Sequence, residues 1–134
     1  MTPQDILAMP ADAYMNEIQQ EYFRQVLLGR QAETLDSIAV ARDTLANLGN
    51  AADPADLATI EEDRQSLTRK LDRLNTQLID IRSALKAIDD GEYGWCESSG
   101  EEIGLPRLLA QPTARYSAAS QSLQETISRH YAAA

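Results

Sequence analysis

A heptad repeat in the middle of the chain restricts the possible fold more than any other feature of the sequence. Apolar side chains alternate in steps of four and three residues, at Leu67, Leu71, Leu74, Leu78, Ile81, Leu85 and Ile88. Charged residues fill the positions between them, as they do on the outer faces of a coiled coil. The spacing predicts one long helix over about 55–90, roughly 50 Å long at about 1.5 Å per residue.

A second apolar stripe precedes this helix and would pair with it. Asn16 and Gln19 resemble a capping box that starts a helix near Glu17. Apolar residues then recur at helical spacing, at Ile18, Tyr22, Val26, Leu27, Leu35, Ile38, Ala41, Leu45 and Leu48. The segment 49–54, Gly-Asn-Ala-Ala-Asp-Pro, contains the residue types that interrupt helices. Two such helices joined by a short breaker predict an antiparallel coiled-coil hairpin.

The remainder of the chain predicts a small globular base for this hairpin. The segment 91–112 holds four of the six glycines and two of the five prolines, which indicates irregular structure, with or without short strands. From about Ser117, apolar residues recur every fourth position at Leu123, Ile127 and Tyr131, typical of a final amphipathic helix. The predicted fold is therefore mainly α. Its parts are an N-terminal segment and helix of the base (1–32), the hairpin (33–90, tip at 49–58) and a C-terminal region (91–134).

Composition excludes several classes of function. Lys and Arg number 12 against 21 Asp and Glu, so the net charge is −9, and no basic run is present. Nucleic-acid binding needs clustered cations, so direct contact with DNA or RNA is not expected. No run of 18 apolar residues exists and the N-terminus lacks the pattern of a signal peptide, so we expect no membrane segment and a cytoplasmic protein. Aromatic residues are only 5% of the chain, which disfavours a β-sandwich.

The chain has too few cysteine and histidine residues for an internal disulfide or a structural zinc site. The chain has one Cys and one His, which cannot form an internal disulfide or fill a four-ligand zinc site. Cys96 is either a reactive thiol or a buried cysteine that has no reactive role, and the second case is the commoner one for a lone cysteine. His130 lies near the C-terminal end of the last predicted helix, where the helix dipole accounts for it without catalysis. We find no Gly-x-Ser-x-Gly motif, and no enzyme activity is predicted.

Four segments, in order along the chain, carry a resemblance to a known family. They are Tyr14-Met-Asn16, Asp53-Pro-Ala-Asp-Leu-Ala58, Gly91-Glu-Tyr-Gly-Trp-Cys-Glu-Ser-Ser-Gly-Glu-Glu-Ile-Gly104 and Arg107-Leu-Leu-Ala-Gln-Pro-Thr-Ala114. Together with the hairpin layout, they resemble the DksA/TraR family of RNA polymerase-binding transcription regulators, from about residue 12 to 125. The resemblance implies a regulator that enters the polymerase secondary channel with its hairpin tip and changes the lifetime of promoter complexes, without binding DNA.

The chain departs from the family at the zinc finger. The four positions that are cysteines in the family's zinc site read Cys96, Ser99, Ser117 and Ser120. A serine hydroxyl stays protonated near neutral pH and is not a structural zinc ligand, so no zinc is expected. The chain resembles in this respect the metal-independent paralogues of DksA. Packing and serine hydrogen bonds would replace the metal, and the candidate packing residues are Tyr93, Trp95, Ile103, Leu105, Leu108 and Tyr116.

The acids of the tip have both a structural and a functional interpretation. Asp53 at an N-cap, Pro54 at the first helical position and Asp56 in the first turn suit the start of any helix. The resemblance implies that Asp53, Asp56 and Ala58 also form the tip that faces the polymerase active site. Capping and function are compatible, since a cap would hold the acids in place.

The resemblance also implies polymerase and alarmone contacts elsewhere. Arg73 and Arg107 match basic docking positions, although solvated surface charges are an equal alternative. The family binds guanosine tetraphosphate through basic side chains, and the matching positions here are Asp80, Gln111 and Gln121. A polyphosphate needs Lys or Arg, so this half of the alarmone site is expected to be absent or weakened.

Two other classes of function remain open at this stage. A Gre-like transcript-cleavage factor also has an acidic coiled-coil tip, but its hairpin is N-terminal and a larger β-rich domain follows it. A generic coiled-coil adaptor or scaffold would tolerate neutral residues at Asp53 and Asp56. Because an intramolecular hairpin satisfies the apolar seam, a monomer is expected.

Overall fold

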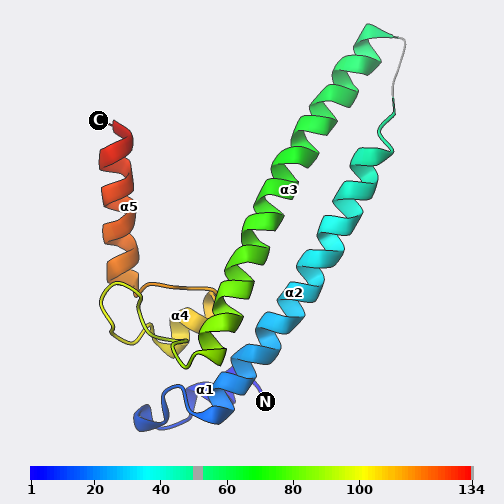
Figure 1. Cartoon of the computed structure of the whole chain (residues 1–134). Helices are drawn as coiled ribbons and strands as arrows, with labels where there is room; N and C mark the ends of the chain where they lie inside the picture. Colours follow the sequence, from blue (N-terminus) through cyan, green and yellow to red (C-terminus); the bar gives the residue numbers. More distant parts are fainter. Residues whose placement is uncertain (50–52, 134) are drawn as a thin grey trace. The chain divides into compact units, whose positions relative to one another are not determined.

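The computed structural model describes residues 1–49 and 53–133 (Figure 1). In these ranges the helices are α1 (Pro3–Leu7), the 3-10 turn η1 (Ala11–Ala13), α2 (Glu17–Ala46), α3 (Pro54–Asp89), α4 (Leu105–Ala110) and α5 (Ala118–Ala133). The described part of the chain forms no β-strand, and an isolated bridge pairs Trp95 with Glu102. The predicted mainly helical fold is confirmed. None of the helices found here combines the length and the apolar character needed to cross a membrane.

The chain divides into two compact units, of which the hairpin (29–82) is one. Figure 1 shows the second half of α2 and the greater part of α3 running antiparallel, side by side. Ile38 and Ala41 of α2, and Leu78 and Ile81 of α3, bury their side chains. This arrangement confirms the predicted coiled-coil hairpin, and α3 has nearly the predicted bounds. Of the predicted tip, 49–58, residues 50–52 lie outside the described residues.

One seam residue of α2 differs from the prediction. Leu35 is 44% exposed, whereas Thr34 is buried. Positions 34, 38 and 41 are spaced by four and three residues, so they lie on one face of the helix. Leu35 is rotated from that face by about 100° around the helix axis. The shorter, half-polar Thr34 therefore occupies the place expected for a leucine.

The second unit consists of residues 1–28 and 83–134, which we call the base. Its core buries Ile6, Phe23, Leu27 and Leu108 completely. Phe23 of α2 and Tyr93 bring their ring centroids within 5.5 Å, and α1 packs against α4. The boundaries differ from the predicted 33 and 90, because the last two turns of α3 belong to the base.

A shifted capping box starts α2. The Asn16 side-chain oxygen accepts a hydrogen bond from the Gln19 N–H at 2.8 Å, as the sequence predicts. The Gln19 side-chain oxygen, however, accepts from the N–H of Met15, also at 2.8 Å, one residue earlier than in a standard box. Met15 has a positive φ of 55°, so the chain turns sharply just before the helix. The amide of Gln19 is completely buried, and this bond satisfies its oxygen.

Some packing predictions for the base are wrong. Tyr93, Ile103 and Leu108 are buried as expected, but Trp95 is 40% exposed. Irregular structure was predicted for 91–112, whereas α4 occupies the end of that segment. The final helix predicted from about Ser117 is confirmed by α5, and its apolar stripe is exposed, with Leu123 at 60% and Tyr131 at 76%.

Candidate functional site

The described part of the hairpin tip is an exposed, acidic helix start. A side-chain oxygen of Asp53 accepts a hydrogen bond from the Ala55 N–H at 2.9 Å, and its carbonyl accepts from the Leu57 N–H at 2.9 Å. Asp53 therefore caps α3. Asp56 lies in the first turn, exposed, and its carboxylate makes no ion pair or hydrogen bond within the described residues. Ala58 is exposed one half-turn further on, so the three predicted tip residues share one short, solvent-facing segment.

The two predicted docking arginines have different environments. Arg73 is exposed on α3 and forms no ion pair with any residue the structure describes. Arg107 is half-buried in α4, and its Nε donates a hydrogen bond to the Tyr116 carbonyl at 2.9 Å. Arg107 thus connects α4 to the segment before α5, a structural role that the sequence did not indicate. Arg73 keeps its guanidinium available to a partner.

The positions matched to alarmone contacts lie on, or at the end of, different helices and carry no cation. Asp80 is half-buried on α3 in the hairpin. Gln111 is the exposed C-cap of α4, and the Gln121 side chain donates a hydrogen bond to Glu125 at 3.2 Å. Gln121 is therefore already paired with a carboxylate, which a phosphate would have to displace.

The four positions that correspond to zinc ligands in the family come together in the base. Cys96 is buried, with 3% exposure, and its sulfur lies 3.4 Å from the Ser98 hydroxyl. Ser99, Ser117 and Ser120 lie close enough to this sulfur for their hydrogen bonding to lower its pKa. Ser117 in turn accepts from the Ser120 N–H at 3.2 Å, which caps the start of α5. The Ser99 hydroxyl likewise accepts from the Glu101 N–H at 3.3 Å, so Ser99 and Ser117 bond nearby backbone, as expected.

This arrangement makes Cys96 an unusually acidic thiol. Burial raises the pKa of Cys96, but the hydrogen bonds from Ser120, Ser98, Ser99 and the Ser117 N–H outweigh it and lower the pKa to about 4. The start of α5, where backbone N–H groups point outward, also favours a thiolate. The sulfur is therefore an anion at neutral pH.

The donor set does not suit a structural zinc ion. It offers one thiolate and three protonated hydroxyls, where zinc requires four thiolate or imidazole ligands. Across 1–49 and 53–133, His, Cys, Asp and Glu form no group of three or more that could hold a metal ion.

Tyr14 connects both ends of the knuckle, the segment 94–104 that carries Cys96. Its hydroxyl donates to the Gly94 carbonyl at 2.6 Å and accepts from the Gly104 N–H at 3.0 Å. Its ring meets that of Trp95 edge-on, with centroids 5.4 Å apart. Burial raises the pKa of Tyr14, so the hydroxyl keeps the proton it donates. The sequence analysis used Tyr14 only as part of a family motif and missed this role.

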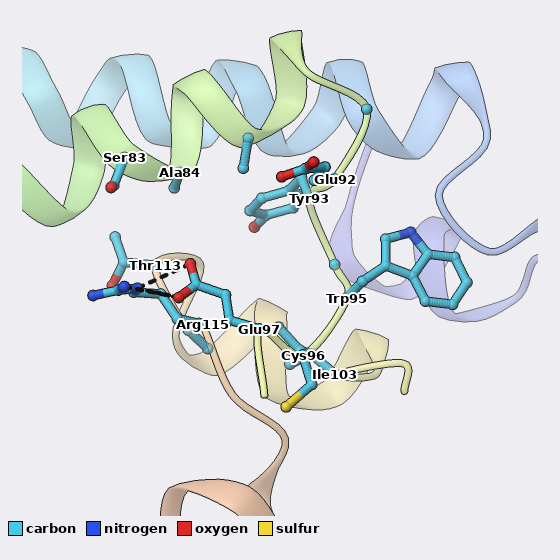
Figure 2. Close-up of a pocket in the computed structure, with 14 residues that line it drawn as sticks. Ser83, Ala84, Glu92, Tyr93, Trp95, Cys96, Glu97, Ile103, Thr113 and Arg115 are labelled. Atoms are coloured by element: carbon cyan, nitrogen blue, oxygen red, sulfur yellow. Dashed lines mark hydrogen bonds and ion pairs between the residues drawn. The ribbon is translucent and has the colours of Figure 1, made fainter. Parts of the chain in front are cut away.

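A salt bridge and a second tyrosine complete the scaffold of the knuckle. Glu97 and Arg115 face each other beside a cavity of about 420 Å³, and the Cys96 sulfur points away from Tyr93 (Figure 2). The closest Arg115–Glu97 contact is 2.7 Å, in a two-pronged arrangement. The Tyr93 hydroxyl donates to the Pro112 carbonyl at 2.7 Å. Hydrogen bonds from side chains distant in sequence thus hold the segment that a metal holds in a zinc finger.

The structure therefore defines a class of protein: a coiled-coil hairpin with an acidic tip, joined to a zinc-finger-like base that hydrogen bonds organise. Two family models match the chain. The DnaK suppressor protein DksA N-terminal domain covers residues 19–88, and the prokaryotic dksA/traR C4-type zinc finger covers 91–125. The chain belongs to the DksA/TraR family, as the sequence motifs predicted.

Relatives with names and a solved structure agree with this assignment. The RNA polymerase-binding transcription factor DksA of Caulobacter vibrioides (strain NA1000 / CB15N) is 42% identical over 118 residues, 85% of this chain and 81% of the relative. The protein of the same name from Escherichia coli K12 is 37% identical over 109 residues, 78% of this chain and 70% of the relative. The structure of transcription factor DksA2 from Pseudomonas aeruginosa superposes with a TM-score of 0.86 and 42% identity, over 96% of this chain and all of that one.

Proposed function

We propose that this protein is a transcription regulator that binds RNA polymerase directly and does not turn over a substrate. The relatives described above bear the name of RNA polymerase-binding transcription factors, and the chain covers most of their length. With a net charge of −9 and no basic run, the protein acts on polymerase and not on DNA. Polymerase binding would place it in the cytoplasm, and the satisfied hairpin seam favours a monomer.

The hairpin tip carries the regulatory activity in this proposal. The supporting observation is the free, exposed carboxylate of Asp56 next to the cap formed by Asp53. We propose that the tip enters the secondary channel and approaches the active site. There, carboxylates either perturb the catalytic magnesium ion or contact mobile catalytic elements, and the lifetime of the promoter complex changes. Arg73, which has no ion-pair partner among the residues that the structure describes, would contact an acidic polymerase surface. Arg107 would contribute mainly by ordering the base.

The protein would work without zinc and with a weakened alarmone response. Support for zinc independence comes from the hydrogen bonds that converge on Cys96 and from the unsuitable donor set. Support for a weak response to guanosine tetraphosphate comes from Asp80, Gln111 and Gln121, none of which can pair with a phosphate charge. The protein would thus act in a stringent-response type of control, for example on ribosomal RNA promoters, when zinc is scarce.

In vitro transcription from a ribosomal RNA promoter, with purified polymerase, tests the tip. We expect the wild-type protein, stripped with a chelator, to change transcript yield, and Asp56→Asn to lose this effect while it still binds polymerase. Glu62→Gln, which removes an exposed acid further along α3, is the matched control and should behave as wild type. If Asp56→Asn remains fully active, the tip mechanism is wrong. If the wild type fails to bind polymerase, the proposed function is wrong.

The alarmone proposal predicts a gain of response. A variant with Asp80→Lys, Gln111→Arg and Gln121→Lys restores cations at the three positions. We expect guanosine tetraphosphate to strengthen the effect of this variant severalfold more than that of the wild type. Asp63→Lys with Asp72→Lys, an equal change of charge on the exposed surface of α3, is the control. An equally strong alarmone effect on the wild-type protein would contradict the proposal.

An adaptor or scaffold without regulatory activity is the alternative. It would tolerate the neutral residue at position 56, so the same transcription assay separates the two. The Gre-like alternative loses support, because the residues after the hairpin form helices and one isolated bridge, with no strand in the described part of the base.

A further inference from the structure

An apolar groove lies on the first turns of α2, in the base. It has a volume of about 680 Å³ and is lined by Met1, Glu17, Ile18, Glu21, Tyr22, Gln25 and Val26. The sequence placed Ile18 and Tyr22 in the stripe that packs, yet Ile18 is 51% exposed. The core contacts of α2 are made by another face, through Gln19, Phe23 and Leu27, all completely buried. The beginning of α2 thus has two apolar faces, and only one is covered.

The geometry of the groove suits a helix. Ile18, Tyr22 and Val26 follow one another at intervals of four residues, so they form a ridge about 12 Å long. Rows of this spacing are those that interdigitate when two helices pack. A helix also satisfies its own backbone hydrogen bonds, whereas an extended segment would find few backbone partners among these side chains. Met1, 67% exposed, adds a flexible thioether that can adapt to an incoming side chain.

The charges beside the groove indicate what kind of helix fits. Glu17 and Glu21 border the apolar ridge, and the Glu21 side chain is 61% exposed. Glu21 accepts a hydrogen bond from Gln25 at 2.8 Å, but its ionic contact with Arg24 is long, 3.7 Å. Arg24 is more closely engaged with Asp89, at 2.8 Å. The groove therefore presents two carboxylates beside apolar surface, and the Arg24 cation that contacts Glu21 is shared with Asp89.

We propose that this groove binds an amphipathic helix of a partner protein, with Lys or Arg residues flanking its apolar stripe. Apolar side chains of the partner would cover Ile18, Tyr22 and Val26, while its cations pair with Glu17 and Glu21. A second copy of this chain is disfavoured as the occupant, because each copy carries a net charge of −9. The proposal concerns a different surface from the hairpin tip and does not depend on the proposed regulatory function.

Fluorescence anisotropy with labelled peptides tests the proposal on the full-length protein. The probe is a Leu/Lys peptide of about five helical turns, with leucines at helical spacing. A peptide of the same composition, with the leucines scrambled, reports binding that depends on charge alone. Two variants alter the groove: Ile18→Ser with Tyr22→Ser removes apolar surface, and Glu17→Lys with Glu21→Lys reverses the charge. Their controls are Val40→Ser, an exposed apolar residue elsewhere on α2, and Glu62→Lys with Asp63→Lys on α3.

We expect the patterned peptide to bind the wild type at least about tenfold more tightly than the scrambled one, and both groove variants to lose about tenfold in affinity. The control variants should bind as the wild type does, and circular dichroism should show equal helix content in all proteins. The proposal is overturned if the two peptides bind equally, or if the controls weaken binding as much as the groove variants do. It is also overturned if light scattering finds a dimer that Ile18→Ser dissociates, because the occupant is then a second copy.

Discussion

Removing one hydroxyl group, in Tyr14→Phe, should measure how much the hydrogen bonds of Tyr14 stabilise the knuckle. The hydroxyl accepts from the Gly104 N–H and donates to the Gly94 carbonyl, at 3.0 and 2.6 Å. The variant therefore leaves the Gly104 N–H without this acceptor, whereas the Gly94 carbonyl keeps its second donor, the Ile103 N–H at 2.9 Å. An unsatisfied buried group costs about 1–3 kcal/mol, and the half-buried location lets water compensate in part. We therefore expect a loss of about 2 kcal/mol in the free energy of unfolding. For a chain of this length that corresponds to a melting temperature lower by about 7 °C.

The assay is thermal and urea unfolding, followed by circular dichroism and by the fluorescence of the single tryptophan. Trp95 contacts the Tyr14 ring, and Phe keeps that ring, so its fluorescence separates loss of the hydroxyl from loss of packing. Tyr131→Phe is the matched control, because Tyr131 is 76% exposed and its hydroxyl makes no hydrogen bond within the described residues. If Tyr14→Phe melts within about 1 °C of this control, the two hydrogen bonds contribute little and the reasoning is refuted.

Further tests address the turn and the thiol of the knuckle. Gly94→Ala should destabilise the protein by more than about 1 kcal/mol, because Gly94 has a φ of +93° and a Cβ would lie 2.7 Å from the Met15 Cγ. Gly100→Ala has a similar φ of +74° but open space around its Cβ, so an equal loss in both variants would exclude the clash as the cause. Because hydrogen bonds outweigh burial and lower the pKa of Cys96 to about 4, the folded state keeps a thiolate at a pH where the unfolded chain holds a thiol. The thiolate therefore stabilises the fold fully above the pKa of the unfolded chain, and this stabilisation falls as the pH drops toward 4. The ultraviolet absorbance of the thiolate should titrate near that pH in the wild type and be absent in Cys96→Ser. A titration midpoint near pH 8–9 would contradict the assignment.

Around the knuckle, side-chain hydrogen bonds join parts of the chain that are distant in sequence. A structural zinc ion is worth on the order of 10 kcal/mol in small fingers, and it acts by joining distant parts of the chain. Here the joining is distributed over Tyr14, Tyr93 and the Glu97–Arg115 pair, with the cysteine sulfur as a shared acceptor. Each of these interactions contributes only a small part of the stability, so we expect each single substitution to lower the free energy of unfolding in part and not to unfold the base.

The sequence by itself determined the helical architecture and the family. A heptad seam and a helix breaker leave few alternatives to a hairpin. Apolar periodicity and the helix-breaking effect of Gly and Pro both depend on residues within one or two helical turns, so the sequence shows them directly. The bounds of α2 and α3 were therefore predictable, and so was the capped start of α3 at Asp53. The short helices α1 and α4 were not predicted, because segments this short depend on the surface against which they pack.

Only the tertiary structure decided which polar side chains act together. Tyr14 lies 80 residues or more from its partners Gly94 and Gly104, and no local pattern relates them. The four zinc positions could be named from the resemblance, and Ser98 and Ser99 are close to Cys96 in sequence, but the acidity of Cys96 also depends on Ser117 and Ser120, which only folding brings to its sulfur. The groove on α2 was hidden for the same reason: periodicity shows that Ile18 and Tyr22 lie on an apolar stripe, but the packing of the base decides which stripe is covered. Contacts between distant residues depend on the relative placement of whole elements, and local sequence does not encode that placement.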